Sequence, residues 1–421
     1  MTAPKLRFKE FNGDWSNSEL GQIIGISSAS RVFKEQWQDS GVPFFRTSDV
    51  SALFKNKENE KAYISVELFE ELSKKSGRIQ KDDLLVTGGG TIGIPYLVPN
   101  NDPLYFKDAD LLWFKSSGVI EGSFLYNFLI SSKFREYLKS ISHTGTISHF
   151  TIEQAKTTPF KFPIKEEQTK IASFLSAVDE KISQLTQKHS LLSQYKKGMM
   201  QKLFSQQIRF KADDGSEFGE WEEVKFSDVF NFHQTNSHSR ALLSENGEIM
   251  NIHYGDIHTK FSMLFDVTKE KVPFLSDEVN TSKINEDQFL NVGDLVIADA
   301  SEDYKDIGKA IEVVNLNEQK IVAGLHTYIA RPKKAFALGF NGYLMQIFVV
   351  REQIKKLATG ISVLGISKTN LGKIELSVPC LEEQTKIANF LSAIDQKIEV
   401  VAQQIEQAKM WKKGVLQQMF V

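Results

Sequence analysis

A glycine-rich run is the first feature of the sequence that could take part in chemistry. Residues 88–93 read Gly-Gly-Gly-Thr-Ile-Gly, which matches the G-x-G-x-x-G pattern of dinucleotide-binding proteins. That pattern works where a helix starts directly after it and presents its N-terminus to the pyrophosphate. Residues 94–99 instead form an extended run with two prolines. The sequence therefore favours a glycine-rich loop near a ligand over a cofactor site.

Other residues that commonly support catalysis or metal binding are absent or scattered. The sequence has no G-x-x-x-x-G-K-[ST], H-E-x-x-H or G-x-S-x-G motif. The spacing of His143 and His149 suits a polar loop better than a metal cluster. The one cysteine, Cys380, excludes a disulfide framework and a four-cysteine zinc site. We therefore expect neither catalytic residues nor a bound metal or cofactor in this chain.

Polar loops at matching places in the two halves of the chain are the remaining candidates for function. Arg, Asn, Ser, Thr, His and Lys side chains can reach the base edges and phosphates of DNA, and glycine allows close backbone approach. The expected DNA-contacting residues are Arg31, Arg46, Thr47, Ser48, Thr87, Gly88, Gly89, Gly90, Thr91, Thr144, Gly145, Thr146, Ser148 and His149, and in the second half His238, Arg240, His253, Tyr254, Ser301, Lys305, Lys368, Thr369 and Asn370. The alternative is that these are ordinary solvated loops. Arg46 and Arg240 are the first candidates for a base contact.

The sequence also contains two copies of one long predicted helix. Residues 166–172 return as residues 382–388, both reading Glu-Glu-Gln-Thr-Lys-Ile-Ala, and the offset of 216 persists to the ends of the copies. Apolar residues recur in alternating steps of four and three, and this period of 3.5 is typical of a coiled coil. The predicted seam consists of Ile171, Leu175, Val178, Ile182, Leu185, Leu192, Met199 and Leu203, and of Ile387, Leu391, Ile394, Ile398, Val401, Ile405, Val415 and Met419.

Each helix follows a globular segment, and the two segments are divergent copies. Short motifs match, for example residues 145–148 with residues 364–367, while the sequence between the motifs differs. We predict an α+β domain over residues 1–164, a spacer helix over 165–206, a second α+β domain over 207–380 and a C-terminal spacer helix over 381–421. One scaffold that carries two different variable surfaces indicates a protein that reads two different things.

Charge and hydropathy limit the possible partners. The net charge is −2, and a DNA-binding protein that acts alone is usually more basic. If the chain touches DNA, another subunit is expected to supply much of the positive surface. No run of eighteen apolar residues and no signal-peptide pattern is present. We therefore expect a cytoplasmic protein without a membrane partner.

Together these residues resemble the specificity (S) subunit of Type I restriction–modification systems. The resemblance rests on the duplicated helix start, which follows Phe162-Pro163 in one copy and Val378-Pro379 in the other. Supporting stretches are residues 293–296 and 81–88. Two departures are small: Asp82 takes a glycine place, and Cys380-Leu381 replaces a more usual proline-containing pair.

The resemblance implies two target recognition domains in tandem, joined by two long antiparallel coiled-coil helices with pseudo-twofold symmetry. Each domain would read one half of an asymmetric bipartite site in double-stranded DNA, and the helices would set the spacer and dock two methyltransferase (M) subunits. Restriction (R) subunits would complete a phage-defence endonuclease complex. S-adenosylmethionine, ATP and Mg would then be bound by those partners, and this chain would be non-catalytic. A self-sufficient methyltransferase or nuclease, and a coiled-coil scaffold without a DNA role, stay open as alternatives.

Overall fold

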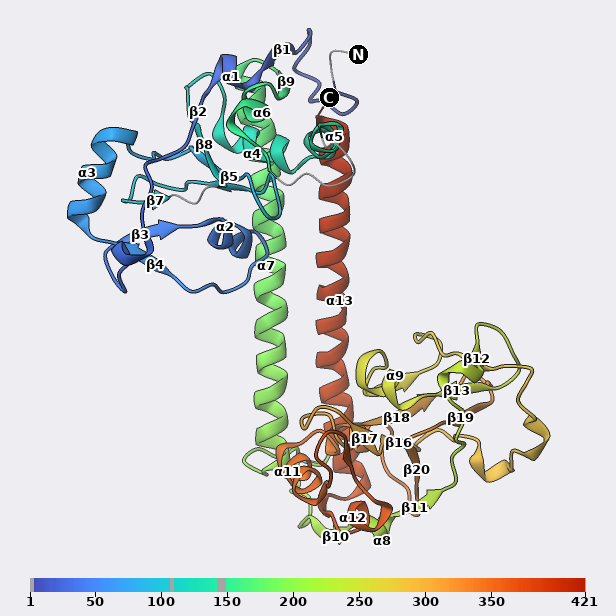
Figure 1. The fold of residues 1–421 in the computed structure, drawn as a ribbon. Coiled ribbons are helices and arrows are strands. Elements are labelled where there is room, and N and C mark those ends of the chain that lie inside the picture. Colours follow the sequence, from blue (N-terminus) through green and yellow to red (C-terminus); the bar gives the residue numbers. More distant parts are fainter. Residues whose placement is uncertain (1–3, 107–109, 142–148, 421) are drawn as a thin grey trace. The chain divides into compact units, whose positions relative to one another are not determined.

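The computed structural model describes residues 4–106, 110–141 and 149–420. The chain forms two compact units: residues 1–187 with 402–421, and residues 188–401. These limits cut through both long helices, α7 (Lys165–Phe204) and α13 (Leu381–Met419). Each unit therefore contains one α+β domain and a part of each long helix (Figure 1). No described helix is long and apolar enough to cross a membrane.

The first unit is built around two small sheets. One has the strand order β2-β8-β5-β6 and the other the order β4-β3-β7, while β1 pairs with β9. The elements of this domain are β1 (Ser16–Glu19), α1 (Leu20–Ile23), β2 (Gly25–Ser27), η1 (Lys34–Gln36), β3 (Val42–Phe45), α2 (Thr47–Phe54), β4 (Ala62–Ile64), α3 (Val66–Ser76), β5 (Leu84–Thr87), β6 (Pro95–Leu97), β7 (Tyr105–Phe106), β8 (Leu111–Lys115), α4 (Gly122–Ile130), α5 (Ser132–Ser140), α6 (Ile152–Lys156) and β9 (Pro159–Phe162).

The central strand β5 is buried on both faces. Leu84 and Val86 point into one hydrophobic core, and Leu85 points into the other. Successive side chains of a strand alternate between the two faces of a sheet, so a strand between two cores must be apolar throughout. This explains why residues 84–86 lack the polar alternation of a surface strand.

The second unit has the same arrangement, with more strands in its two sheets. Its main sheet has the order β11-β20-β16-β18-β14, a second sheet has the order β12-β15-β13-β19, and β10 pairs with β22. Its elements are β10 (Glu222–Lys225), α8 (Phe226–Val229), β11 (Phe230–His233), η2 (Arg240–Leu242), β12 (Leu243–Ser244), β13 (Met250–Ile252), α9 (Tyr254–Thr259), β14 (Leu264–Asp266), β15 (Phe274–Leu275), η3 (Thr281–Lys283), η4 (Glu286–Gln288), β16 (Leu295–Ala298), β17 (Ala300–Ser301), β18 (Ala310–Asn315), β19 (Ile321–Ala323), β20 (Thr327–Pro332), α10 (Phe340–Leu344), α11 (Phe348–Leu357), β21 (Leu364–Gly365), α12 (Lys368–Gly372) and β22 (Glu375–Val378).

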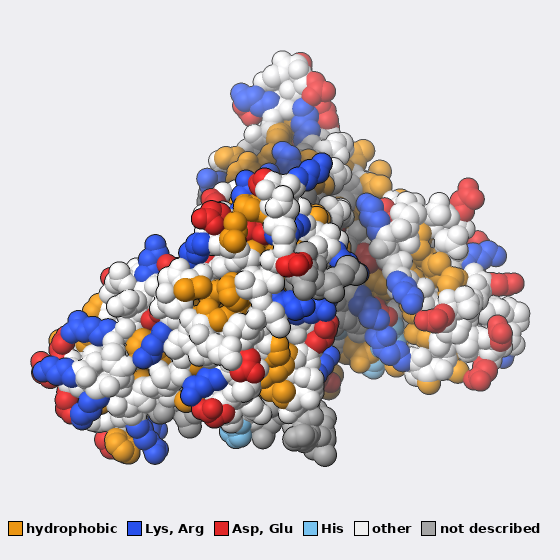
Figure 2. All heavy atoms as spheres, turned by 90° about the horizontal axis from the view of Figure 1, so that it is seen from above, with side chains coloured by type: hydrophobic (Ala, Val, Ile, Leu, Met, Phe, Trp, Pro, Cys, Tyr) orange, Lys and Arg blue, Asp and Glu red, His pale blue; other side chains and the backbone are white. Residues whose placement is uncertain are grey.

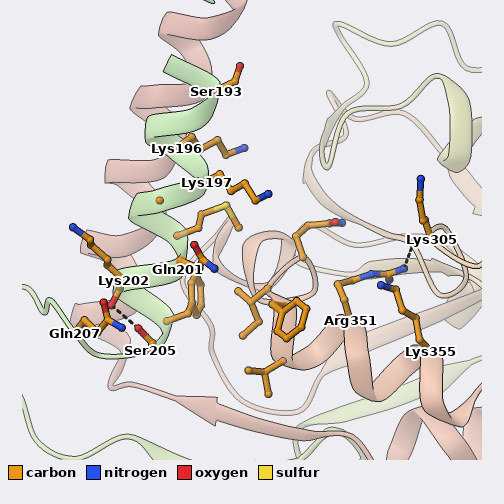
Figure 3. A pocket seen from close by; sticks show the side chains of 17 residues that line it. Ser193, Lys196, Lys197, Gln201, Lys202, Ser205, Gln207, Lys305, Arg351 and Lys355 are labelled. Carbon is orange, nitrogen blue, oxygen red and sulfur yellow. Dashed lines mark hydrogen bonds between the residues drawn. The ribbon is translucent and has the colours of Figure 1, made fainter. Parts of the chain in front are cut away.

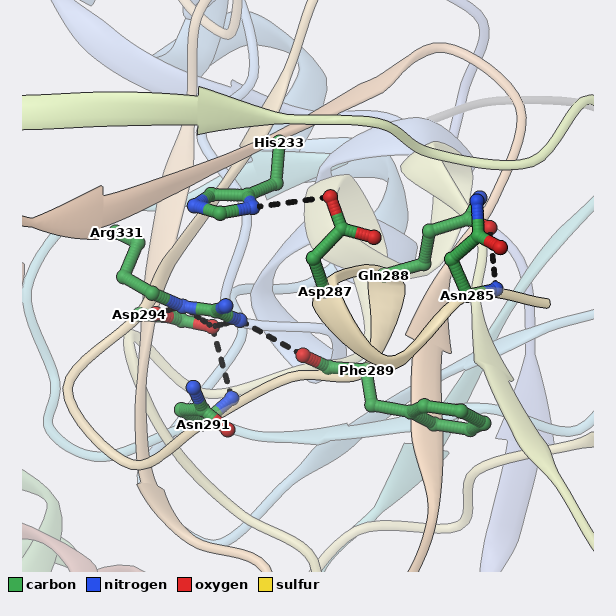
Figure 4. Close-up of polar contacts among 8 residues, drawn as sticks. All are labelled: His233, Asn285, Asp287, Gln288, Phe289, Asn291, Asp294 and Arg331. Atoms are coloured by element: carbon green, nitrogen blue, oxygen red, sulfur yellow. Dashed lines mark hydrogen bonds and ion pairs between the residues drawn. The ribbon is translucent and has the colours of Figure 1, made fainter.

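A buried aspartate closes the turn before the central strand of each unit. In the second unit Asp294 accepts a hydrogen bond from the backbone N–H of Asn291 (2.8 Å), and its carboxylate takes the guanidinium of Arg331 at 2.7–3.3 Å (Figure 4). In the first unit Asp83 accepts from the indole N–H of Trp113 at 2.8 Å. The preceding residue has positive φ in both turns, at Gly293 and at Asp82. Aspartate tolerates this conformation better than most residues, which explains the departure at position 82.

The Glu-Glu-Gln start of each long helix ties that helix to its own domain. Glu167 is buried and accepts two hydrogen bonds from the guanidinium of Arg7, at 2.8 and 2.7 Å. The Gln168 amide donates to the carbonyl oxygen of Pro163 (2.9 Å) and accepts from the backbone N–H of Glu121 (2.9 Å). The second unit repeats these contacts with Glu383, Arg209, Gln384, Pro379 and Ala337. The repeated motif is therefore explained by contacts within each unit.

The long helices pack against each other through the predicted seam. Every predicted seam position is buried or half-buried. In the second unit Lys196 pairs with Asp395 at 2.6 Å, and in the first unit Lys412 pairs with Asp179 at 2.6 Å. These two ion pairs join the same two positions of the 216-residue repeat with the helices exchanged. Within each unit the end of one helix thus lies beside the start of the other, which is the antiparallel arrangement that the family resemblance implied (Figure 1).

Candidate nucleic-acid interface

Arg46, a first candidate for base contact, is held inside the first unit. It precedes α2, and its guanidinium bonds to the Asp49 carboxylate at 2.8 and 3.2 Å and to the carbonyl oxygen of Glu60. The guanidinium also lies 5.2 Å from the ring centre of Trp37. Beside it, Ser48 is exposed and Thr47 is half-buried. In this structure Arg46 therefore orders the loop that presents these two residues.

Arg240 has a different environment in the second unit. It donates one hydrogen bond, at 3.0 Å, to the buried carboxylate of Asp256, which is also paired with Lys260 at 2.9 Å. Half of the Arg240 side chain stays exposed. Asp256 and Asp49 are both the third residue of the helix that follows their strand. In both domains an arginine thus pairs with the aspartate at this equivalent position, but the two arginines come from different parts of their domains.

Tyr254 lies among three imidazole rings. Its ring centre is 4.6 Å from that of His253, 6.0 Å from His258 and 5.3 Å from His326. Burial lowers the pKa of His253, and the nearby positive charge of Arg240 lowers this pKa further. The second unit therefore has a cluster of aromatic rings around Tyr254, beside Arg240, to which His258 and His326 contribute although sequence reasoning did not select them.

The glycine-rich loop of the first unit packs against a histidine–aspartate pair. The Nδ1 atom of His149 lies 2.9 Å from the Oδ1 atom of Asp110. A Cβ atom on Gly89 would collide with the Asp110 side chain, and one on Gly88 would lie 2.6 Å from the carbonyl oxygen of Phe150. These two glycines are buried and make room for contacts within the domain, while Gly90 stays exposed.

The residues that flank these glycines make hydrogen bonds within the loop. Thr87 is buried, and its hydroxyl donates to the carbonyl oxygen of Thr91 (2.6 Å) and accepts from the N–H of Ile94 (2.9 Å). The loop leads into strand β6, where the dinucleotide-binding pattern would have a helix. Thr91 is exposed, and Thr144, Gly145, Thr146 and Ser148 lie outside the described residues.

The matching loops of the second unit meet at one end of its main sheet. Strand β17 pairs with β21, and the Nδ1 atom of His326 lies 3.1 Å from the Oδ1 atom of Asp299. Ser301 is buried and donates to the carbonyl oxygen of Asp303 at 2.9 Å. Ser367 caps α12 as Thr151 caps α6. Residues 145–148, which were predicted to match 364–367, lie outside the described residues, and among the described ones Thr151 corresponds to Ser367.

The other predicted contact residues are spread more widely. Lys368 lies over the ring of Tyr328 at 5.2 Å, and the Asn370 amide donates to the carbonyl oxygen of Leu357 at 3.0 Å. Burial raises the pKa of Tyr328 to about 12. Thr369 is exposed, and so is Arg31, whose guanidinium lies over its neighbour Phe33. The half-buried His238 donates its backbone N–H to Asn236 at 3.0 Å.

Lys305 lines a groove in the second unit (Figure 3). The groove has a volume of about 1110 Å³ and lies between the end of α7 and the start of α11. Its cations are Lys196, Lys197, Lys202, Lys305, Arg351 and Lys355, and its described lining includes no Asp or Glu. Phe348 and Val349 are mostly exposed beside these cations. A groove that combines positive charge with apolar side chains is suited to a macromolecular partner.

Charges of both signs are interspersed over the face drawn in Figure 2. Lys and Arg side chains alternate there with Asp and Glu, in keeping with a net charge of −2. Of the described residues, no three or more His, Cys, Asp and Glu are grouped closely enough to hold a metal ion.

Known proteins share both the sequence pattern and this fold. A model of the Type I restriction modification DNA specificity domain matches residues 12–193 and 219–410. A Methanocaldococcus jannaschii protein assigned as the MjaX specificity subunit of a type I restriction enzyme is 24% identical, over 98% of this chain and 94% of its own length. The MjaVIII specificity subunit of the same organism is 28% identical over 69% of this chain and 68% of its own length.

Solved structures agree with this match at the level of the fold. The S subunit of a Type I restriction–modification system from M. genitalium aligns over 100% of this chain and 99% of its own, with a TM-score of 0.57 and 16% identity. A chain from a type I restriction–modification complex aligns over 96% of both chains with a TM-score of 0.56. Because the specificity-domain model matches both halves of the sequence, this chain belongs to the Type I restriction–modification specificity subunits.

Proposed function

We propose that each α+β domain of this specificity subunit reads one half of an asymmetric bipartite DNA site. The observation that carries this proposal is one backbone framework that occurs twice with different side chains. Arg46 with Ser48 and Arg240 with Tyr254 flank the same helix start in the two domains. Different side chains on one framework would read different bases, because bases are distinguished by donors and acceptors at their edges.

The long helices would set the distance between the two half-sites. Helix α7 is continuous over 40 residues and extends from the first unit into the second. At 1.5 Å per residue such a helix is about 60 Å long. The Glu-Gln contacts described above fix each domain to the start of its own helix. The number of helical residues between these fixed points would then determine the spacer.

Two methyltransferase subunits would dock on the long helices. Gly198 and Gly414 occupy the same position of the repeat inside these helices, and a Cβ atom on either would meet no described atom within 4 Å. A glycine inside a helix costs about 0.5–1 kcal/mol relative to alanine. Glycine at both places is explained if a partner approaches the helix backbone closely there, once in each unit. Gly198 also lines the basic groove.

Catalysis would belong to the partner subunits. We infer that methyltransferase subunits bind S-adenosylmethionine and methylate adenine, and that restriction subunits use ATP and Mg, in the cytoplasm. The specificity subunit is the non-catalytic member of such a complex. The mixed surface charge supports this division of labour, because additional subunits would supply much of the positive charge that DNA binding needs.

The decisive experiment is to map adenine methylation in the genome by single-molecule sequencing, in cells that express this chain with its neighbouring methyltransferase. A motif of two short half-sites around a fixed gap is expected. Methylation by the purified chain alone would support a self-sufficient enzyme instead. The absence of any motif, together with failure of the purified complex to retain DNA, would leave a coiled-coil scaffold without a DNA role.

A further inference from the structure

Three backbone positions meet beyond the end of the central strand in the first unit. They are occupied by Gly88, Asp110 and His149. The Gly88 N–H donates to the carbonyl oxygen of Asp110, and the N–H of Phe150, next to His149, donates to the carbonyl oxygen of Gly88 at 2.6 Å. These hydrogen bonds define a small framework that holds the His149–Asp110 pair.

The second unit has the same framework with other residues. The Asp299 N–H donates to the carbonyl oxygen of His326 at 3.1 Å, and the N–H of Ile366, next to Gly365, donates to the carbonyl oxygen of Asp299 at 2.9 Å. The pairing of β16 with β20 and of β5 with β8 gives the same correspondence, because Ala298 faces Thr327 as Thr87 faces Leu111.

The histidine–aspartate pair therefore occurs in both units but occupies different positions of the framework. In chain order the three positions are Gly88, Asp110 and His149 in the first unit, and Asp299, His326 and Gly365 in the second. Each unit thus contains one Asp, one His and one Gly, shifted by one position. The same side-chain pair has been built twice from non-equivalent residues, which indicates a requirement for the pair itself and not merely inheritance of a position.

The exposure and geometry of the two pairs are those of a binding group. The side chains of His149 and His326 are 60% and 49% exposed, while their aspartates are more covered. In both pairs Nδ1 faces the carboxylate, and no hydrogen bond joins Nε2 to another residue that the structure describes. His326 also adopts a positive φ of 57°, a conformation that non-glycine residues rarely adopt and that often marks a functional position.

Resting on the proposed function, we propose that each histidine–aspartate pair binds a phosphate of the DNA backbone. The rest of the two surfaces differs, as reading of different bases requires, whereas the phosphate backbone is common to both half-sites. A contact that both domains share is therefore assigned to the part of DNA that both half-sites share. A phosphate oxygen only accepts hydrogen bonds, so Nε2–H donates to the phosphate while Nδ1 stays on the carboxylate. The aspartate is the positioning residue.

The test uses the complete complex and a duplex that carries its methylation motif. His326→Ala is expected to weaken binding about ten-fold, as loss of a hydrogen bond to a charged group does. It is also expected to reduce the slope of log K against log salt concentration by about 0.9, one phosphate contact. His326→Gln, which keeps a donor, should recover part of the affinity. The methylated sequence should stay unchanged in every variant.

Asp299→Asn separates positioning from simple charge. If the carboxylate acts only by its charge, its removal near DNA strengthens binding, whereas the proposal requires weaker binding because the imidazole loses the carboxylate that orients its ring. A triple variant, Asp299→Gly with His326→Asp and Gly365→His, moves the first unit's arrangement into the second. A Cβ at residue 365 would have only ordinary contacts, the nearest being 3.7 Å from the carbonyl oxygen of Asp299. Aspartate also tolerates the positive φ at residue 326. This variant should bind better than His326→Ala.

Each result decides between clear outcomes. Wild-type affinity and salt dependence in His326→Ala would overturn the phosphate contact. A changed base preference at one position of the motif would show that His326 contacts a base instead of a phosphate. If the wild-type complex itself does not bind a split site, the proposed function fails and this inference fails with it. Normal binding by the wild type keeps these two failures distinguishable.

Discussion

Replacing Trp221 with phenylalanine is expected to destabilise the second unit more than Trp15→Phe destabilises the first. The two tryptophans occupy matching places in the sequence repeat, in Gly13-Asp14-Trp15 and Gly219-Glu220-Trp221. The indole N–H of Trp221 donates to Glu383 at 3.0 Å, in addition to the fork from Arg209. The indole N–H of Trp15 has no hydrogen-bond partner among the described residues. The two sites therefore offer a matched pair of substitutions.

The expected difference comes from one hydrogen bond. The two tryptophans are 8% and 3% exposed, so the loss of ring volume in each substitution has a similar cost and largely cancels in the comparison. What remains is a hydrogen bond to a buried carboxylate, worth about 1.5–3 kcal/mol. Trp221→Phe should therefore lower the free energy of unfolding of its unit by about that much more than Trp15→Phe lowers that of the first unit.

Urea titration with hydrogen exchange read by mass spectrometry would measure each unit separately. Combining Trp221→Phe with Glu383→Gln in a double-mutant cycle would isolate the coupling between the two side chains, because substitutions of contacting residues are not additive. Equal losses at the two tryptophans, or a coupling near zero, would refute the reasoning. Either outcome would mean that the Glu383 carboxylate gains no stability from the indole.

Three further predictions follow from other features of the chain. Burial raises the pKa of Glu312 from 4.5 to about 7. The free energy of unfolding should therefore be highest below about pH 4.5 and fall by about 3 kcal/mol as the pH rises through 7. Glu312→Gln should flatten this pH dependence when denaturation is measured at pH 4.5 and at pH 8. Adding four residues after Gln187 and four after Val401 lengthens each helix by about 6 Å, which corresponds to about one to two base pairs of DNA. Methylation mapping should then reveal a wider gap between unchanged half-sites. New half-sites around the original gap would contradict a spacer role for the helices. Gly198→Leu and Gly414→Leu should each stabilise the helix slightly yet reduce methyltransferase binding at least about ten-fold in sedimentation experiments, since the side chain would block close approach; unchanged binding would argue against docking there.

The α+β class, the duplication and the paired helices could be predicted because they depend on local patterns. The seam residues recur every 3.5 positions, and that period follows from the geometry of supercoiled helices whatever the surrounding fold. The buried central strands could be recognised in the same way, since runs such as residues 84–86 and 295–297 are apolar on both faces. The Glu-Glu-Gln motif marked each helix start, although its role in binding Arg7 and Arg209 needed the structure.

The candidate site was less predictable because its contacts join distant residues. Asp110 and His149 are 39 residues apart, and Asp299 and His326 are 27 residues apart, and strand pairing alone brings each pair together. His149 and Gly365 are related by the same offset of 216 as the long helices, whereas the motif match of residues 145–148 with 364–367 implies an offset of 219 and so concealed this correspondence.

The sequence by itself determined a duplicated scaffold of two α+β domains and two coiled-coil helices, because backbone geometry converts hydrophobic period directly into helix and strand. The tertiary structure decided what the polar residues do. Gly88 and Gly89 accommodate contacts within the domain, and Arg46 is held by a buried carboxylate. The physical reason is that a polar side chain acts through whichever partner lies within about 3 Å, and only the folded chain determines that partner.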